Sequence, residues 1–111
     1  MRGINQGDLY WVQLPASHDP ALFIPHPYVI VQENPTIEAC ALTSNLKRIS
    51  VPGNVLLDAG EANLLKPSVV EVSKVSILDK TQLGDYIGSV SDHRIQQILA
   101  GIRFVQTYFP L

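Results

Sequence analysis

The sequence predicts a small, mainly β fold: a barrel of five or six short strands with one α-helix packed on it. Two patterns predict it. Short segments rich in branched and aromatic residues alternate with proline- and glycine-containing turns, and apolar residues recur at helical spacing near the C-terminal end. The 111 residues are 46% hydrophobic and 16% charged, which suits a globular chain, and we expect one domain over residues 1–111.

Three strands are expected in the first half of the chain. Residues 8–14 (DLYWVQL) form the first, and residues 28–32 form the second, which is apolar on both faces and therefore central. A third, at residues 37–43, follows a turn around Asn34-Pro35. Residues 15–27 hold four of the eight prolines and predict a long irregular loop, which in a small domain is usually either functional or disordered.

Two further strands are expected after a turn at Pro52-Gly53, at residues 54–58 and 69–77. The fifth strand changes phase, because its apolar residues fall at even positions before Ser73-Lys74 and at odd positions after it, where Val75 and Ile77 stand. An inserted residue explains such a change, so we predict a β-bulge there. The bulge could re-aim side chains at an active site, or it could be a bend that closes the barrel.

The last part of the chain predicts a helical turn over residues 79–84 that stops at glycine, a short strand at residues 86–90, and a helix capped by Ser91. Gly101 within that helix costs about 1 kcal/mol against alanine, which suggests close packing of another backbone, although a harmless glycine is also possible. Pro110 ends the helix. Its apolar stripe comprises Ile95, Ile98, Leu99, Ile102, Val105 and Phe109.

Charge and cysteine content limit the function classes. The formal net charge is −2, so any nucleic-acid binding requires a local basic patch, such as Lys47-Arg48. No apolar run approaches the ~20 residues that span a bilayer, and MRGINQGD lacks the apolar core of a signal peptide. The single cysteine, Cys40, lies in an apolar run, and we expect a buried free thiol in a reducing cytoplasm rather than a nucleophile.

His26 is the most unusual polar residue of the chain. In FIPHPYVIVQ it stands between two prolines at the start of an apolar run, and proline restricts both its own φ and the preceding residue. An imidazole held this rigidly could take part in chemistry, or it could be a polar plug at the strand entrance.

Four segments in order resemble the PemK/MazF toxins of bacterial toxin–antitoxin systems, from about Gly7 through the C-terminal helix. They read GDLYWVQL, HPYVIVQ, CALTSNLKR and PGNVLLDAGEANLLKPSVVEVSKVSILDKTQLGDYIGSV. The resemblance implies an SH3-like barrel, a homodimer, and ribosome-independent, sequence-selective cleavage of single-stranded RNA through a 2′,3′-cyclic phosphate. It also implies a cognate antitoxin that occupies the RNA site, and no cofactor.

The resemblance carries two catalytic positions onto this chain. Thr43 matches the threonine of the family's T-S or T-T pair, with Ser44 beside it, whereas His26 stands where active members typically have a phosphate-contacting arginine. The loop at residues 17–22 departs from the family's E-Q-x-G segment, and Ser73 stands where some members have an acidic residue. Contacts assigned to those two places are therefore not transferred.

The expected chemistry requires a base for the 2′-hydroxyl, donors for the charged phosphate, and an acid for the leaving 5′-oxygen. It requires no metal, and the three histidines, His18, His26 and His93, do not have the spacing of metal ligands. Arginine is a permanent bidentate phosphate clamp, whereas an imidazole, with a reference pKa of about 6.5, can also exchange a proton near neutrality. Replacing arginine by His26 should therefore make cleavage more dependent on pH.

Several residues are candidates for substrate binding, each with a structural alternative. His18 could pair with His26 as base and acid, or it could be an exposed loop residue. Thr43 could donate to a phosphate, or bond the local turn backbone. Trp11 and Tyr28 could stack a base, but core packing is favoured for both. Ser44 has the same two readings as Thr43. The remaining candidates for phosphate contact are Asn45, Lys47-Arg48, which could instead form a solvated turn, and Lys74 beside the predicted bulge, which could also donate a proton.

Two other functions remain open for this fold. One is a non-catalytic RNA- or protein-binding member that lost cleavage together with the arginine. The other is a gyrase-poisoning toxin, which acts by binding a protein; the segments CALTSNLK and GNVLLDAGEAN match the RNA-cleaving branch more closely.

Overall fold

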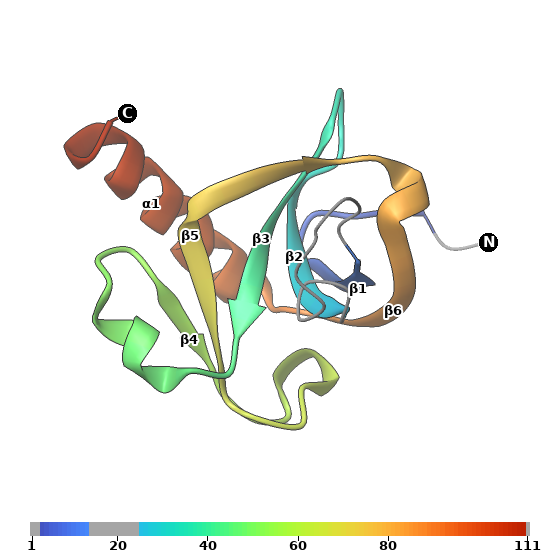
Figure 1. Cartoon of the computed structure of the whole chain (residues 1–111), viewed down its shortest axis with the longest axis horizontal. Helices are drawn as coiled ribbons and strands as arrows, with labels where there is room; N and C mark the ends of the chain where they lie inside the picture. Colours follow the sequence, from blue (N-terminus) through green and yellow to red (C-terminus); the bar gives the residue numbers. More distant parts are fainter. Residues whose placement is uncertain (1–2, 14–24, 111) are drawn as a thin grey trace, which may run out of the picture.

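The computed structural model describes residues 3–13 and 25–110, and these form one six-stranded antiparallel sheet with a C-terminal helix (Figure 1). The strand order is β4-β5-β3-β2-β1-β6. The mainly β fold with one C-terminal helix is confirmed. The strands are β1 Asp8–Val12, β2 His26–Gln32, β3 Ile37–Thr43, β4 Val55–Leu57, β5 Ser68–Leu78 and β6 Leu83–Ser89; the helix is α1 Asp92–Tyr108, and the short 3-10 segments are η2 Leu46–Ser50, η3 Glu61–Asn63 and η4 Lys80–Gln82.

The third strand lies where it was predicted, and the second begins earlier than predicted. His26 and Pro27 belong to β2 because they pair with Val12 and Trp11 of β1, so the predicted loop extends too far at this end. Residues 15–24 of that loop, and Leu14 of the predicted first strand, lie outside the described residues. The expected helical turn is also shorter: η4 ends at Gln82, and Gly84 belongs to β6.

The predicted irregularity in the fifth strand is present. Cys40 of β3 lies opposite Val75 of β5, but Leu42 lies opposite Val70, so the extra residues of β5 fall at positions 71–74. The register shift keeps Val70 and Val75 in contact with the same core. Ile77 was expected to continue this apolar pattern but does not contact the core. It lies opposite Glu38 near the end of the strand and is 71% exposed.

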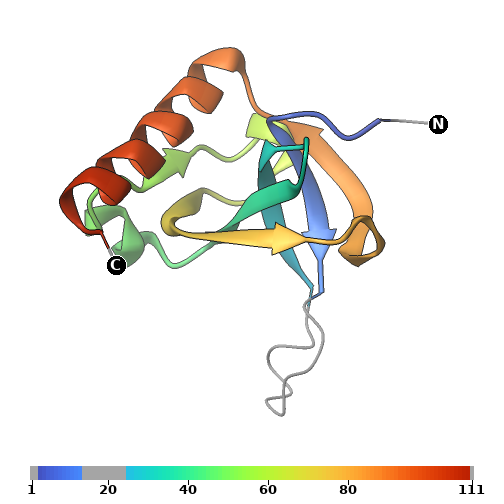
Figure 2. The same cartoon turned by 90° about the horizontal axis from the view of Figure 1, so that it is seen from above.

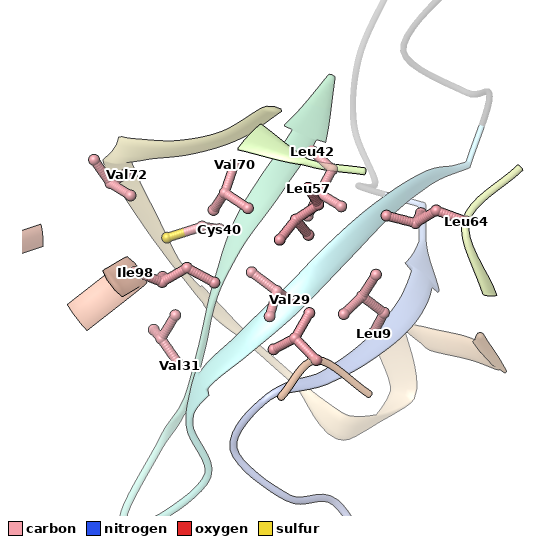
Figure 3. Close-up of a cluster of buried hydrophobic side chains, with 11 residues drawn as sticks. Leu9, Val29, Val31, Cys40, Leu42, Leu57, Leu64, Val70, Val72 and Ile98 are labelled. Atoms are coloured by element: carbon pink, nitrogen blue, oxygen red, sulfur yellow. The ribbon is translucent and has the colours of Figure 1, made fainter. Parts of the chain in front are cut away.

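The larger core cluster lies between the curved sheet and α1 (Figures 2 and 3). Figure 3 shows Ile98 of α1 reaching toward Val29, Val31 and Cys40, while Leu64 closes the opposite end of the cluster. Cys40 is fully buried and free, as predicted. A second cluster, on the other side of the sheet, is formed by Tyr10, Val12, Tyr28, Ile30, Ala39 and Leu78.

The helix begins and ends close to the predicted residues. Ser91 caps it by accepting a hydrogen bond from the backbone N–H of Arg94 at 3.2 Å. Gly101 packs against the backbone of Gly53, as its cost within a helix suggested. Phe109 was expected in the apolar stripe, but α1 ends at Tyr108 and Phe109 is 56% exposed. Among the described residues, no helix is long and apolar enough to cross a membrane.

Candidate active site

The ends of four neighbouring strands lie together along one side of the sheet, and this places His26 near Thr43. The C-terminal end of β1 pairs with the beginning of β2, where Val12 lies opposite His26. In the pairing of β2 with β3, Tyr28 lies opposite Ala41; continued by two residues, the same register leads to His26 and Thr43. Thr43 in turn pairs with Val69 at the beginning of β5.

A pocket of about 580 Å³ opens at this edge. It brings together His26, Thr43 and Ser44, three of the predicted site residues, although they come from two different strands and the turn after β3. His26 is exposed and Thr43 is half-buried, so both are accessible to a ligand. The lining residues are Trp11, His26, Pro27, Leu42, Thr43, Ser44, Asn63, Leu64, Leu65, Lys66, Ser68 and Ile87.

Thr43, which lines the pocket, and Asn45, which does not, make local hydrogen bonds in the turn after β3. The Oγ1 atom of Thr43 accepts a hydrogen bond from the backbone N–H of Asn45 at 3.2 Å, and Asn45 Oδ1 accepts one from the N–H of Lys47 at 3.2 Å. The structural alternative for Thr43, bonding to the turn backbone, is therefore present. The Thr43 hydroxyl can still bind a ligand, because a hydroxyl that accepts one hydrogen bond can still donate its own hydrogen.

The segment between β4 and β5, together with the first residue of β5, contributes residues that sequence reasoning missed. Lys66 brings a cation to the pocket, and Asn63 and Ser68 bring polar groups. Asn63 Nδ2 donates to the carbonyl oxygen of Ile87 at 2.8 Å, which ties the segment to β6, and Ser68 Oγ donates to the carbonyl oxygen of Lys66 at 3.1 Å. No sequence signal placed Lys66 in the same pocket as His26, because the two residues come from distant parts of the chain and are brought to it by the folding of the whole sheet.

Trp11 lines the pocket with 42% of its surface exposed, so the expectation that it packs in the core was wrong. Trp11 shares its face of β1 with Leu9, which is fully buried in the larger core, but Trp11 lies near the end of the strand, where that face borders the pocket. Tyr28 is buried as expected, and burial is the largest cause of the raised pKa of its hydroxyl.

The basic candidates lie outside the pocket. Lys47, Arg48 and Lys74 all belong to the described residues, and none of them lines the pocket. The Nε atom of Arg48 donates to Glu71 Oε1 at 3.1 Å, which turns that guanidinium toward β5. Lys74 is exposed and lies further along β5 than Val69, in the irregular part of the strand.

The other two histidines are not brought to the pocket by the described part of the chain. His18 lies outside the described residues. His93 is exposed in the first turn of α1, where its ring Nε2 lies 3.2 Å from Gln97 Nε2. Within residues 3–13 and 25–110, no group of three or more His, Cys, Asp or Glu side chains could hold a metal ion.

Comparisons with known proteins agree on one family. The model of the PemK-like, MazF-like toxin of type II toxin–antitoxin systems matches residues 5–105. Two curated relatives, Endoribonuclease MazF2 of Mycobacterium bovis and Endoribonuclease MazF6 of Mycobacterium tuberculosis, are each 32% identical over 111 residues, which cover 92% of this chain and 96% of each relative.

Solved structures share the fold. An endoribonuclease in complex with its cognate antitoxin from Mycobacterial species superimposes with a TM-score of 0.75 at 20% identity, covering 96% of this chain and 97% of that one. The Mycobacterium tuberculosis toxin MazF-mt6 gives a TM-score of 0.72 at 17% identity, covering 90% of this chain and 96% of that one. At these identities the likeness concerns the fold alone.

Proposed function

The chain belongs to the PemK-like, MazF-like toxins of type II toxin–antitoxin systems, and we propose that it is an endoribonuclease that cleaves single-stranded RNA at a preferred sequence. The observation that carries this proposal is the pocket in which His26, Thr43 and Lys66 meet beside the exposed Trp11. It offers a proton-exchanging group, a hydroxyl donor, a cation and an aromatic ring to one ligand.

The proposed reaction uses the RNA's own 2′-hydroxyl as the nucleophile. Removal of its proton lets the 2′-oxygen attack the adjacent phosphorus, and the bond to the 5′-oxygen of the next nucleotide breaks. The products are a 2′,3′-cyclic phosphate and a free 5′-hydroxyl, so the step needs one base, one acid and donors to the phosphate oxygens, without a ribosome or a metal.

His26 is proposed as a catalytic residue, since an imidazole can accept the 2′-hydroxyl proton or protonate the leaving oxygen. Thr43 is proposed to donate its hydroxyl hydrogen to a phosphate oxygen. Its oxygen already accepts the N–H of Asn45, which restricts the direction in which the hydroxyl can donate. Lys66, which also lines the pocket, is proposed to add a positive charge where charge on the phosphate develops.

The neighbouring residues are proposed to bind the rest of the RNA. Trp11 offers its exposed ring for base stacking, and Ser44 offers a hydroxyl at the pocket rim. Asn45, Lys47 and Arg48 follow on the same turn and can track the phosphate backbone, as Lys74 can from β5. His18 remains a proposed contact in the part of the chain outside the described residues.

Partner proteins and location belong to the same proposal. We expect a cognate antitoxin that covers the RNA pocket, a homodimer, and a cytoplasmic site of action, where messenger RNA is found. Two findings support the antitoxin: the chain belongs to a toxin–antitoxin family, and one structural neighbour is in complex with its own cognate antitoxin. The gyrase-poisoning alternative is not favoured, because the curated relatives carry the name of endoribonucleases.

The test is cleavage of a long single-stranded RNA by the purified chain in EDTA, with the ends of the fragments mapped. We expect cuts at a recurring short motif, and a loss of about a hundredfold or more in His26→Ala and Thr43→Ala. His93→Ala, on the exposed surface of α1, is the matched control and should cleave as the wild type does. Intact RNA with the wild-type protein would instead support the non-catalytic binding alternative.

A further inference from the structure

The segment from Asp58 to Lys66, here called the pocket loop, is bound to α1 through hydrogen bonds from Arg94 to Glu61. The Nε atom of Arg94 donates to Glu61 Oε1 at 2.9 Å, and its Nη2 atom donates to Glu61 Oε2 at 2.8 Å. Two parallel hydrogen bonds of this kind fix the relative orientation of the two groups as well as their distance. Arg94 therefore connects the helix to the loop that supplies Asn63 and Lys66 to the pocket.

This contact differs from an ordinary surface ion pair. The Arg94 and Glu61 side chains are only 21% and 28% exposed. Glu61 Oε2 also accepts the backbone N–H of Asp58 at 2.7 Å, so the carboxylate braces the beginning of the loop while Arg94 holds it. The hydrogen bonds from Arg94 lower the pKa of the Glu61 carboxyl, as expected when the charged form is the one bound. Arg94 Nη1 in turn donates to Gln97 Oε1 at 2.9 Å, which orients the guanidinium on the helix.

The backbone of the pocket loop needs such support. Ala62 and Asn63 adopt left-handed conformations, with φ of 49° and 62°, which cost free energy in residues other than glycine and persist where surrounding contacts impose them. The loop closes on itself through the N–H of Gly60, which donates to the carbonyl oxygen of Leu64 at 2.7 Å. Its Ala62 carbonyl lies directly against Gly88 of β6, where a Cβ atom would not fit.

We propose that Arg94 is a positioning residue for RNA cleavage: through Glu61 it holds the pocket loop in the shape that places Lys66 in the pocket with His26 and Thr43. The inference rests on the proposed function for its catalytic consequence, but the control of loop geometry by Arg94 stands independently of it. An ion pair that only adds stability would leave the action of Lys66 unchanged in molecules that remain folded.

The experiment is a double-mutant cycle between Arg94 and Lys66. Arg94→Gln should lower kcat/KM for a short RNA by roughly ten- to hundredfold, because a misplacement of about 1 Å is enough for such a loss. Lys66→Ala should lower it by a comparable factor, and adding Arg94→Gln to Lys66→Ala should then have little further effect. Arg94→Lys should restore only part of the rate, since lysine cannot form the two parallel hydrogen bonds. Arg103→Gln removes an exposed arginine from the same helix and serves as the matched control.

Native-state hydrogen exchange provides the second measurement and does not depend on catalysis. In Arg94→Gln and in Glu61→Gln, we expect faster exchange of the loop amides of Gly60 and Leu64, while the amides of β2 and β3 keep their protection. The inference is overturned if Arg94→Gln leaves loop exchange unchanged. It is also overturned if Arg94→Gln lowers kcat/KM by the same factor in Lys66→Ala as in the wild type. A wild-type chain that cleaves no RNA would overturn the proposed function alone, because loop exchange in the two variants would still decide whether Arg94 positions the loop.

Discussion

Gly101 of α1 and Gly53 of the turn before β4 touch through their backbones. A Cβ atom on Gly101 would collide with the carbonyl oxygen of Gly53 and would lie 3.3 Å from Val72 Cγ1. Gly53 itself has a φ of 88°, which other residues rarely adopt. The helix can therefore approach the sheet this closely only with glycine at both positions, and this approach lets Ile98 enter the core.

The first prediction concerns this contact. Gly101→Ala should lower the free energy of unfolding by about 1–3 kcal/mol, because the cost of overpacking exceeds the roughly 1 kcal/mol that alanine adds in helix propensity. Urea unfolding at equilibrium measures the change. Ala100→Gly, at the exposed neighbouring position, should cost only about 1 kcal/mol from propensity. If Gly101→Ala proved as stable as the wild type, the helix would not need this close approach.

The second prediction concerns Asn54, which bridges two segments. Its Nδ2 atom donates to the carbonyl oxygen of Arg48 at 2.9 Å, and its Oδ1 atom accepts the N–H of Val72 at 3.1 Å. Asn54→Ala should destabilise the protein by roughly 1–3 kcal/mol, since it leaves two partly buried backbone groups without this partner. Asn34→Ala, at an exposed turn position, is the control for urea unfolding and should stay within about 0.5 kcal/mol of the wild type.

The third prediction concerns the buried thiol of Cys40. Burial, with a smaller contribution from Glu38, raises the pKa of this thiol to about 12 from an ordinary value of 9.0. The folded state then keeps a proton that the unfolded chain loses above about pH 9. Stability should accordingly fall as the pH rises from 9 toward 12, with a slope of at most about 1.4 kcal/mol per pH unit from this group.

Cys40→Ala provides the comparison for that slope. The variant should be less stable near neutral pH, because it leaves a small cavity, but it should lose less stability between about pH 9 and about pH 10.5. Urea unfolding over this range measures both slopes. Equal slopes in the two proteins would mean that the thiol ionises as easily in the folded chain as in the unfolded one.

The fourth prediction uses Trp11, the single tryptophan of the chain. If a base stacks on its exposed ring, an RNA oligonucleotide should quench the intrinsic fluorescence on binding. Trp11→Ala should weaken binding by roughly 5- to 150-fold, the equivalent of about 1–3 kcal/mol of stacking, whereas Trp11→Phe should retain part of it. Binding with unchanged fluorescence, and with unchanged affinity in Trp11→Ala, would place the RNA elsewhere.

Features encoded by neighbouring residues could be predicted from the sequence. The bulge in β5 follows from a change of apolar phase across Ser73-Lys74, and the contact of Gly101 follows from a costly glycine inside an apolar helix. Each depends on periodicity within one element, which the sequence displays directly. The strand β3 was delimited correctly for the same reason.

Features that depend on contacts between distant segments could not be predicted. Trp11 faces the pocket although Leu9, on the same face of β1, is fully buried, and a five-residue strand does not reveal where along that face the core ends. Lys66 lines the pocket from a loop that Asn63 ties to β6 and that Glu61 ties to Arg94 of α1. These interactions span many residues along the chain, so no local pattern indicates them.

The last prediction concerns the chemistry of His26. An imidazole changes its charge near neutral pH, whereas a guanidinium remains charged, so the two side chains should give different pH profiles at the same position. We expect the kcat/KM of His26→Arg to depend on pH less steeply than that of the wild type. His93→Arg makes the same change on the exposed surface of α1 and should keep the wild-type profile. Should His26→Arg and the wild type share one profile, the pH dependence would arise from another group and His26 would only fill the entrance of β2. A flatter profile with retained cleavage would show that either side chain supports the reaction, with the histidine making it responsive to pH.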